Sequence, residues 1–149
     1  MKARLAAACA CLTLLLCLTA CGPGTGADLV ASALDLNTSQ AEAGTHTDSH
    51  GGFLGDGLTH IVLDFPDDGP LEQLEQDRQW IPLPMDATTK ALLSFVDAGE
   101  LASIPQGYYR LIDRHSDIQT PILSRNSYNF TLAVYDSQQR TLHYFELDT

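Results

Sequence analysis

After Cys21 the sequence contains no cysteine, because its four cysteines stand at positions 9, 11, 17 and 21. The part of the chain beyond Cys21 therefore has no disulfide, no thiol nucleophile and no cysteine metal ligand. Its folded part must be held together by an apolar core, and about 95 residues are enough for one modest core. We expect a single domain over residues 51–149.

Basic residues are also scarce, with eight Lys and Arg against nineteen Asp and Glu and a net charge of −11. Loss of residues 1–20 would remove Lys2 and Arg4 but no acid, which brings the net charge to −13. Binding to nucleic acid or to anionic lipid headgroups requires positive charge. We therefore expect no nucleic-acid partner.

A long apolar run occurs once, from Leu5 to Leu18. The basic segment Met1–Arg4 precedes it and small residues follow it, which is the profile of a secretory signal. The run falls short of the ~20 apolar residues that a helix needs to cross a bilayer. We interpret residues 1–20 as a cleaved export signal.

The segment Leu18-Thr19-Ala20-Cys21 resembles the lipobox of bacterial lipoproteins. The resemblance implies cleavage before Cys21 and attachment of a diacylglycerol to its sulfur. Since two or more acyl chains give stable attachment, Cys21 would hold the chain at the cell membrane, on the extracytoplasmic side. An ordinary signal peptide cut near Ala20, or an uncleaved anchor, is the alternative.

Residues 21–50 are rich in Gly, Ala, Ser and Thr and contain no aromatic residue. This composition predicts a flexible tether between the membrane and the domain. Helical spacing of Leu29, Ala33 and Leu36 offers a short helix over residues 28–36 as an alternative for part of this stretch.

The remaining sequence predicts an α+β fold. Alternating side chains indicate four strands, over Leu58–Phe65, Gly107–Asp113, Ser127–Asp136 and Thr141–Asp148. Residues 71–79 suit a short helix, and residues 87–98 a stronger one with Asp86 as N-cap and Gly99 at the C′ position. We expect one antiparallel four-stranded sheet with the 87–98 helix packed on one face, in the order β-(α)-α-β-β-β.

The N-terminal histidines suggest two kinds of site. His50-Gly51-Gly52 could form an oxyanion hole, but the Gly-x-Ser-x-Gly elbow that accompanies it in α/β-hydrolases is missing. Zinc-binding residue types also gather here, at His46, Asp48, His50, Asp56 and His60. Their spacing matches no zinc motif. We favour a polar glycine-rich loop, with no bound metal and no cofactor.

The segment Asp113-Arg114-His115-Ser116-Asp117 invites comparison with a catalytic triad. A triad is a spatial arrangement, and side chains of sequence neighbours diverge at the end of a strand. We therefore favour a local role, in which Arg114 pairs with an acid and Asp113 or Ser116 caps the turn.

Several stretches resemble a group of uncharacterised lipoproteins from gut-dwelling, low-GC Gram-positive bacteria. These are residues 50–57, 80–84, 107–115, 127–136 and 144–149. The resemblance implies a cell-envelope location and a shared domain, and it supplies no catalytic residue.

Two functions follow as hypotheses. The first is a membrane-anchored, non-enzymatic binding or accessory module for a protein, peptide or glycan, whose ligand-facing residues are His50, Asp56, Arg114 and His115. Seven aromatic residues on the predicted strands could contribute a binding face, although packing within the sheet explains them as well. The alternative is a small hydrolase or metal-dependent enzyme that uses His50, Asp56 or His115.

Overall fold

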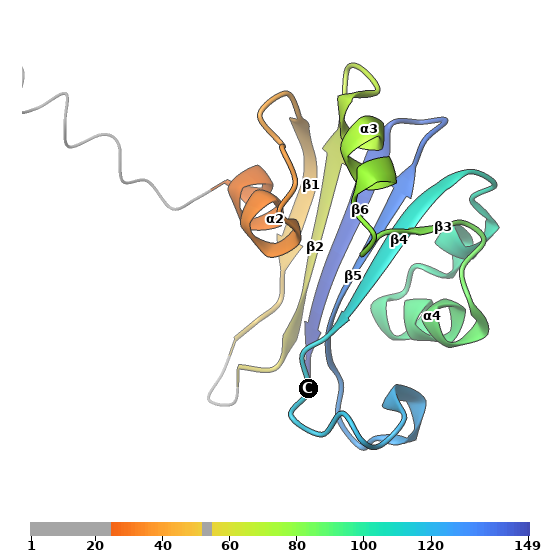
Figure 1. Ribbon diagram of the computed structural model, residues 1–149. Helices are drawn as coiled ribbons and strands as arrows, with labels where there is room; N and C mark the ends of the chain where they lie inside the picture. The colour runs from red at the N-terminus through yellow and green to blue at the C-terminus, as the bar shows by residue number, and fades with distance from the viewer. Residues whose placement is uncertain (1–24, 52–54) are drawn as a thin grey trace, which may run out of the picture.

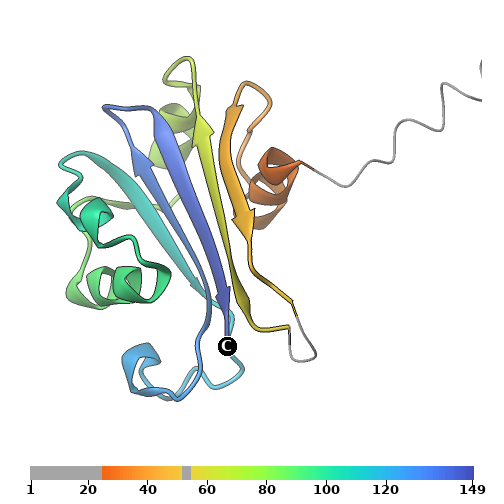
Figure 2. The ribbon, with the colours of Figure 1, turned by 180° about the vertical axis from the view of Figure 1, so that it is seen from behind.

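The computed structural model describes residues 25–51 and 55–149. The expected signal sequence and Cys21 lie outside these ranges. Six strands form one open antiparallel sheet in the order β1-β2-β6-β5-β4-β3. Helices α2 and α3 lie on one face of this sheet and α4 on the other, as the two opposite views show (Figures 1 and 2). The α+β class is as expected.

The strands are β1 (Glu42–Asp48), β2 (Gly57–Asp64), β3 (Ile81–Pro82), β4 (Gly107–Asp113), β5 (Asn129–Asp136) and β6 (Thr141–Asp148). The helices are α2 (Gly26–Leu34), α3 (Gly69–Gln76) and α4 (Ala87–Leu92), with 3₁₀ turns η1 (Leu93–Val96), η2 (Gly99–Ser103) and η3 (Ile122–Ser124). All four predicted strands are present, and their ends differ from the prediction by two residues at most.

The prediction of four strands is wrong at both edges of the sheet. β3 is a two-residue strand that pairs Ile81 with Tyr109, and Pro82 restricts it to an edge because proline donates no hydrogen bond. β1 pairs with β2 from Glu42 opposite Asp64 to Asp48 opposite Thr59, with a register shift after Ala43. Every residue of β1 is exposed, so the strand has no alternating apolar pattern.

The expected tether over residues 21–50 is also corrected, because residues 26–48 belong to the fold. α2 begins with a capping box in which Thr25 and Asp28 exchange hydrogen bonds. It buries Val30 and Leu34 on the sheet. Leu29, one of the residues whose spacing suggested a short helix over residues 28–36, is 37% exposed.

Two apolar clusters hold the layers together. Because successive strand residues point to opposite faces, β6 sends Tyr144 to one cluster and Phe145 to the other. The first cluster packs under α2 and α3 on what we call the front face. The second packs under α4, η1 and η2 on the back face. Helices therefore pack on both faces of the sheet, where one helix on one face was expected.

The predicted 87–98 helix starts as expected and ends earlier. The Asp86 carboxylate accepts a hydrogen bond from the Thr89 backbone N–H, which confirms the N-cap. After Leu92 the chain tightens into η1, and Asp97 takes the left-handed conformation, with a φ of 52°. A short polar side chain tolerates this conformation, so Asp97 ends the helix where Gly99 was expected to.

Candidate functional site

The half of the front face toward the end of β6 carries no helix (Figure 1). We call it the open front half. Strand alternation and register place the following side chains there: Thr59, Ile112, Asn129, Thr131, Glu146 and Asp148. Thr59 and Thr131 are buried, and the other four are at least partly exposed. His50 and Arg114, two of the expected ligand-facing residues, lie over the same surface because both pair with Asp148.

His50 is held between two carboxylates. Its Nδ1 lies 2.7 Å from Oδ1 of Asp48, and its Nε2 lies 3.3 Å from Oδ2 of Asp148. The backbone N–H of His50 also donates to Asp48, at 2.8 Å. A Cβ at Gly57 would lie 2.5 Å from the Cα of His50, so glycine at position 57 permits this approach. The contacts connect the end of β1 to the end of β6.

Arg114 extends the contacts across the sheet. Its Nη2 lies 3.0 Å from Oδ1 of Asp148 and its Nη1 lies 3.2 Å from Oε1 of Glu146. The other carboxylate oxygen of Glu146 accepts a hydrogen bond from the Tyr144 hydroxyl, at 2.7 Å. A chain of paired charges therefore spans β1, β6 and the end of β4.

The pairing shifts the titration of these groups. The hydrogen bond to Asp48 raises the pKa of His50, against the effect of burial and with further help from Asp148. The backbone N–H of His50 lowers the pKa of Asp48, and its ring adds to the effect. Burial, with the hydrogen bond to Glu146, raises the pKa of Tyr144. The protonated imidazole is thus favoured, and both of its nitrogens then act as donors.

His115 lies in a separate polar pocket, on the connection between β4 and β5. Its Nε2 is 3.0 Å from the Ser127 hydroxyl, and its Nδ1 accepts a hydrogen bond from the Asp117 backbone N–H at 2.9 Å. An acceptor Nδ1 leaves the proton of the neutral ring on Nε2. The ring therefore donates to Ser127 and does not remove its proton.

The Asp117 carboxylate does not support His115 either, because its Oδ1 accepts from the backbone N–H groups of Gln119 and Thr120. Hydrogen bonds from Thr120 lower the pKa of Asp117. The Asp113 carboxylate is paired with Arg125, which lowers the pKa of Asp113. The triad geometry is therefore absent from this segment, and the expected pairing partner of Arg114 is found in Glu146 and Asp148.

The remaining predicted residues do not join either group. Asp56 is exposed in the loop before β2. Cys21 lies outside the described residues, so the structure places no atom of the expected lipid site. Sequence reasoning missed Glu146, Asp148, Arg125 and Ser127. The alternation of β6 already places Glu146 and Asp148 on one face, but it does not say which residue lies opposite them.

The possible zinc residues separate in space. His46 lies opposite Ile61 and so on the front face, whereas His60 points to the back face. There the His60 ring stacks on Phe145 with centroids 4.3 Å apart, and His143 lies 6.1 Å from it. Burial lowers the pKa of both histidines. Within residues 25–51 and 55–149, no three His, Cys, Asp or Glu side chains gather as a metal site would require.

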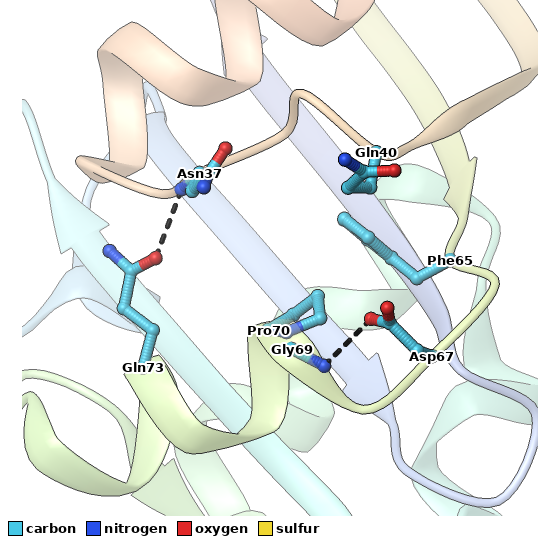
Figure 3. Close-up of a pocket in the computed structure, with 7 residues that line it drawn as sticks. All are labelled: Asn37, Gln40, Phe65, Asp67, Gly69, Pro70 and Gln73. Carbon is cyan, nitrogen blue, oxygen red and sulfur yellow. Dashed lines mark hydrogen bonds between the residues drawn. The ribbon is translucent and has the colours of Figure 1, made fainter.

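A second hollow lies between α3 and the loop that joins α2 to β1 (Figure 3). Its volume is about 120 Å³, well below the ~300–1,000 Å³ of small-molecule pockets. The Gln73 side chain bridges it, since Oε1 accepts from the Asn37 backbone N–H and Nε2 donates to the Asp35 carbonyl. This hollow therefore lies where side-chain hydrogen bonds join α3 to the loop between α2 and β1.

Comparison of the chain with protein-family models, with curated proteins and with solved structures found no match. In the described part of the chain, no helix has the length and apolarity that crossing a bilayer requires.

Proposed function

We propose that this protein is a lipid-anchored module on the extracytoplasmic side of the membrane that binds a partner without transforming it. One observation supports binding over catalysis: at the end of the sheet where His50, Arg114 and His115 lie, the polar groups are paired within the chain while the surface itself stays open. A surface of this kind is suited to contact a partner.

The pairing argues against a hydrolase that uses these histidines. A general base needs a ring nitrogen free to accept a proton from the substrate or a water molecule. His50 has a carboxylate at each nitrogen, and the Nδ1 of His115 already accepts from the backbone. Neither ring holds a nucleophile ready for deprotonation.

The proposed partner is a protein, peptide or glycan. The open front half presents three carboxylates, at Asp48, Glu146 and Asp148, to one guanidinium and one imidazole. Its side chains are partly exposed, with 27% of Glu146 and 31% of Arg114 accessible. The excess of acid on this surface, as in the whole chain, disfavours nucleic acid.

The anchor in this proposal is a lipid on Cys21. α2 begins at Gly26, so the four residues 22–25 would join the lipidated cysteine to the fold. At ~3.5 Å per step, the five Cα–Cα steps from Cys21 to Gly26 span no more than about 17 Å. The domain would therefore be held close to the membrane surface, in contrast to the long tether expected from composition.

The anchor is tested by expressing the full chain in a Gram-positive host fed a labelled fatty acid. We expect label on the wild-type protein and on a Cys17→Ser variant, and none on Cys21→Ser. Cys17 is the matched control because it lies in the apolar run. Label retained by Cys21→Ser, or absent from the wild type, would refute lipidation at this residue.

Binding is tested on intact cells with a photo-crosslinking residue at Asn129, in the open front half, or at Ile81, on the far edge strand. We expect a discrete adduct from position 129 and none from position 81. The absence of any adduct from position 129, or equal adducts from both, would contradict the assignment of the surface.

A further inference from the structure

The connection between β4 and β5, residues 114–128, lines an open polar pocket of about 250 Å³. The residues that line it with Arg125 are His115, Asp117, Thr120, Ser124, Asn126 and Ser127. Its volume lies just below the ~300–1,000 Å³ of pockets for drug-sized ligands. The pocket therefore suits a ligand of about one ring.

A buried arginine shapes this pocket. The side chain of Arg125 is 4% exposed and donates to both oxygens of Asp113 and, through Nε, to the carbonyl of Thr120. Removing a guanidinium from water is costly, and an ion pair of this kind adds little net stability. Its effect is to fix the shape of a long loop, and long ordered loops are most often functional.

The charge of the pocket disfavours an anion. Arg125 and Asp113 neutralise each other, which leaves the carboxylate of Asp117 as the unbalanced charge among the lining residues. The groups that remain are the hydroxyls of Thr120, Ser124 and Ser127 and the amide of Asn126. Hydroxyls and amides both donate and accept hydrogen bonds, which matches a neutral ligand that carries several hydroxyl groups.

Apolar side chains gather around the same loop. Five large apolar residues are exposed in the described chain, and two of them, Ile118 and Leu123, are on this connection. A third, Phe95, packs against Tyr128 with ring centroids 4.4 Å apart, and Tyr128 belongs to the back-face cluster. Ile118 and Leu123 thus give the connection exposed apolar surface beside its polar lining, which suits a ligand that has both hydroxyl groups and C–H faces.

We propose that this pocket binds a single neutral pyranose ring of a glycan. The inference rests on the proposed binding function and specifies its ligand class. The hydroxyls and the Asn126 amide would bond to the sugar hydroxyls. The bound sugar is not cleaved, because His115 is committed to Ser127 and to the backbone.

The test uses the processed full-length protein, labelled with ¹⁵N in detergent micelles, and methyl glycosides of glucose, galactose and N-acetylglucosamine as probes. We expect at least one probe to shift the amide signals of residues 115–128 in a saturable manner. Glucuronate, which adds a carboxylate to the same ring, should bind more weakly. The proposal is wrong if none of the three glycosides shifts these signals, or if glucuronate binds as well as they do.

A double variant, Asn126→Ala with Ser127→Ala, removes polar groups from the pocket. The loss of two hydrogen bonds should weaken the binding of the responsive glycoside about tenfold. Ser103→Ala is the matched control, because the Ser103 hydroxyl bonds to the Glu100 carbonyl in η2. Unchanged amide signals on β2 and β6 show that the double variant is folded, and binding as tight as that of the wild type would then overturn the proposal.

The failure of this inference is distinct from the failure of the proposed function. Adducts from position 129 on cells, with no response to any glycoside, would leave a binding module whose ligand is not a sugar in this pocket. If neither the adducts from position 129 nor a response to a glycoside were seen, the proposed binding function itself would be refuted.

Discussion

Arg125 places its two terminal nitrogens on the two carboxylate oxygens of Asp113, at 2.8 and 2.7 Å. Asp113 is the last residue of β4, and Arg125 follows η3 on the returning chain. The pair thus closes the connection 114–128 at its base, and the third hydrogen bond, to Thr120, fixes the middle of the loop. The planar guanidinium matches this fork of acceptors, which a lysine does not.

We expect Arg125→Ala to loosen this loop and leave the sheet intact. Hydrogen exchange of amides in residues 114–128 should accelerate, and the thermal midpoint should fall. Arg125→Lys should recover little, since an ammonium group cannot make the paired contacts. Arg78→Ala, a change outside the loop, serves as the control. Exchange rates in the loop that match those of the wild type would show that the ion pair does not order it.

The contacts of His50 with Asp48 and Asp148 predict that the stability of the fold depends on pH. Because the folded-state pKa of His50 is raised above its ordinary value of 6.5, the folded chain binds this proton more tightly than the unfolded chain. The stabilisation is therefore complete below pH 6.5 and is lost as the pH rises through the raised pKa. In urea unfolding, His50→Gln should lose stability relative to the wild type at acidic pH and less at alkaline pH.

His60 and His143 contribute in the opposite direction, because burial lowers the pKa of each. Their stabilisation is present above pH 6.5 and falls as the pH drops toward their folded-state pKa values. The wild type and the His50→Gln variant both contain His60 and His143. The difference between their free energies of unfolding therefore reports the contacts of His50 alone. If this difference in stability grew with rising pH, it would contradict the raised pKa of His50.

Gly107 is required by its backbone conformation. Its φ is +144°, and a Cβ there would overlap the carbonyl oxygen of Tyr135 on the neighbouring strand. We expect Gly107→Ala to lower the free energy of unfolding by more than about 2 kcal/mol. At Gly99 a Cβ would meet nothing within 4 Å, so Gly99→Ala should be close to neutral. Chemical denaturation of the two variants compares them directly, and equal stability would be inconsistent with the conformation described.

The place of α2 in the fold is tested within one helix. Leu34 is 1% exposed and Leu29 is 37% exposed. Leu34→Ala should cost ~2–5 kcal/mol of stability, as buried leucines do elsewhere, and Leu29→Ala should cost much less. If both variants unfold like the wild type, residues 26–34 do not pack on the sheet in solution.

The strands that sequence reasoning found are those with a buried face. β5 and β6 alternate between two cores, and residues such as Phe130 and Tyr144 mark their faces clearly. β1 is held by its backbone bonds to β2 and buries none of its side chains. Its composition of Gly, Thr and acids is therefore typical of a linker, and it joins the sheet only through its pairing with β2.

Part of the candidate site could be proposed from the sequence. His50, Arg114 and His115 were expected to face ligand, and the structure places them at one end of the sheet. Their partners were not foreseeable, because Asp148 is 98 residues from His50 along the chain. Arg125 gave no signal either, since a single arginine in a polar loop is usually solvated.

The position of β6 constrains the order in which the fold can form. It is the last of the six strands of this sheet in chain order, yet it lies between β2 and β5 and pairs with both. The β1–β2 and β3–β4–β5 portions share no direct strand pairing, so each lacks its central neighbour until residues 141–148 are in place. Such non-local pairing slows folding. A chain that emerges from a ribosome or a translocation channel would therefore complete its sheet in a single late step, after β6 has come out.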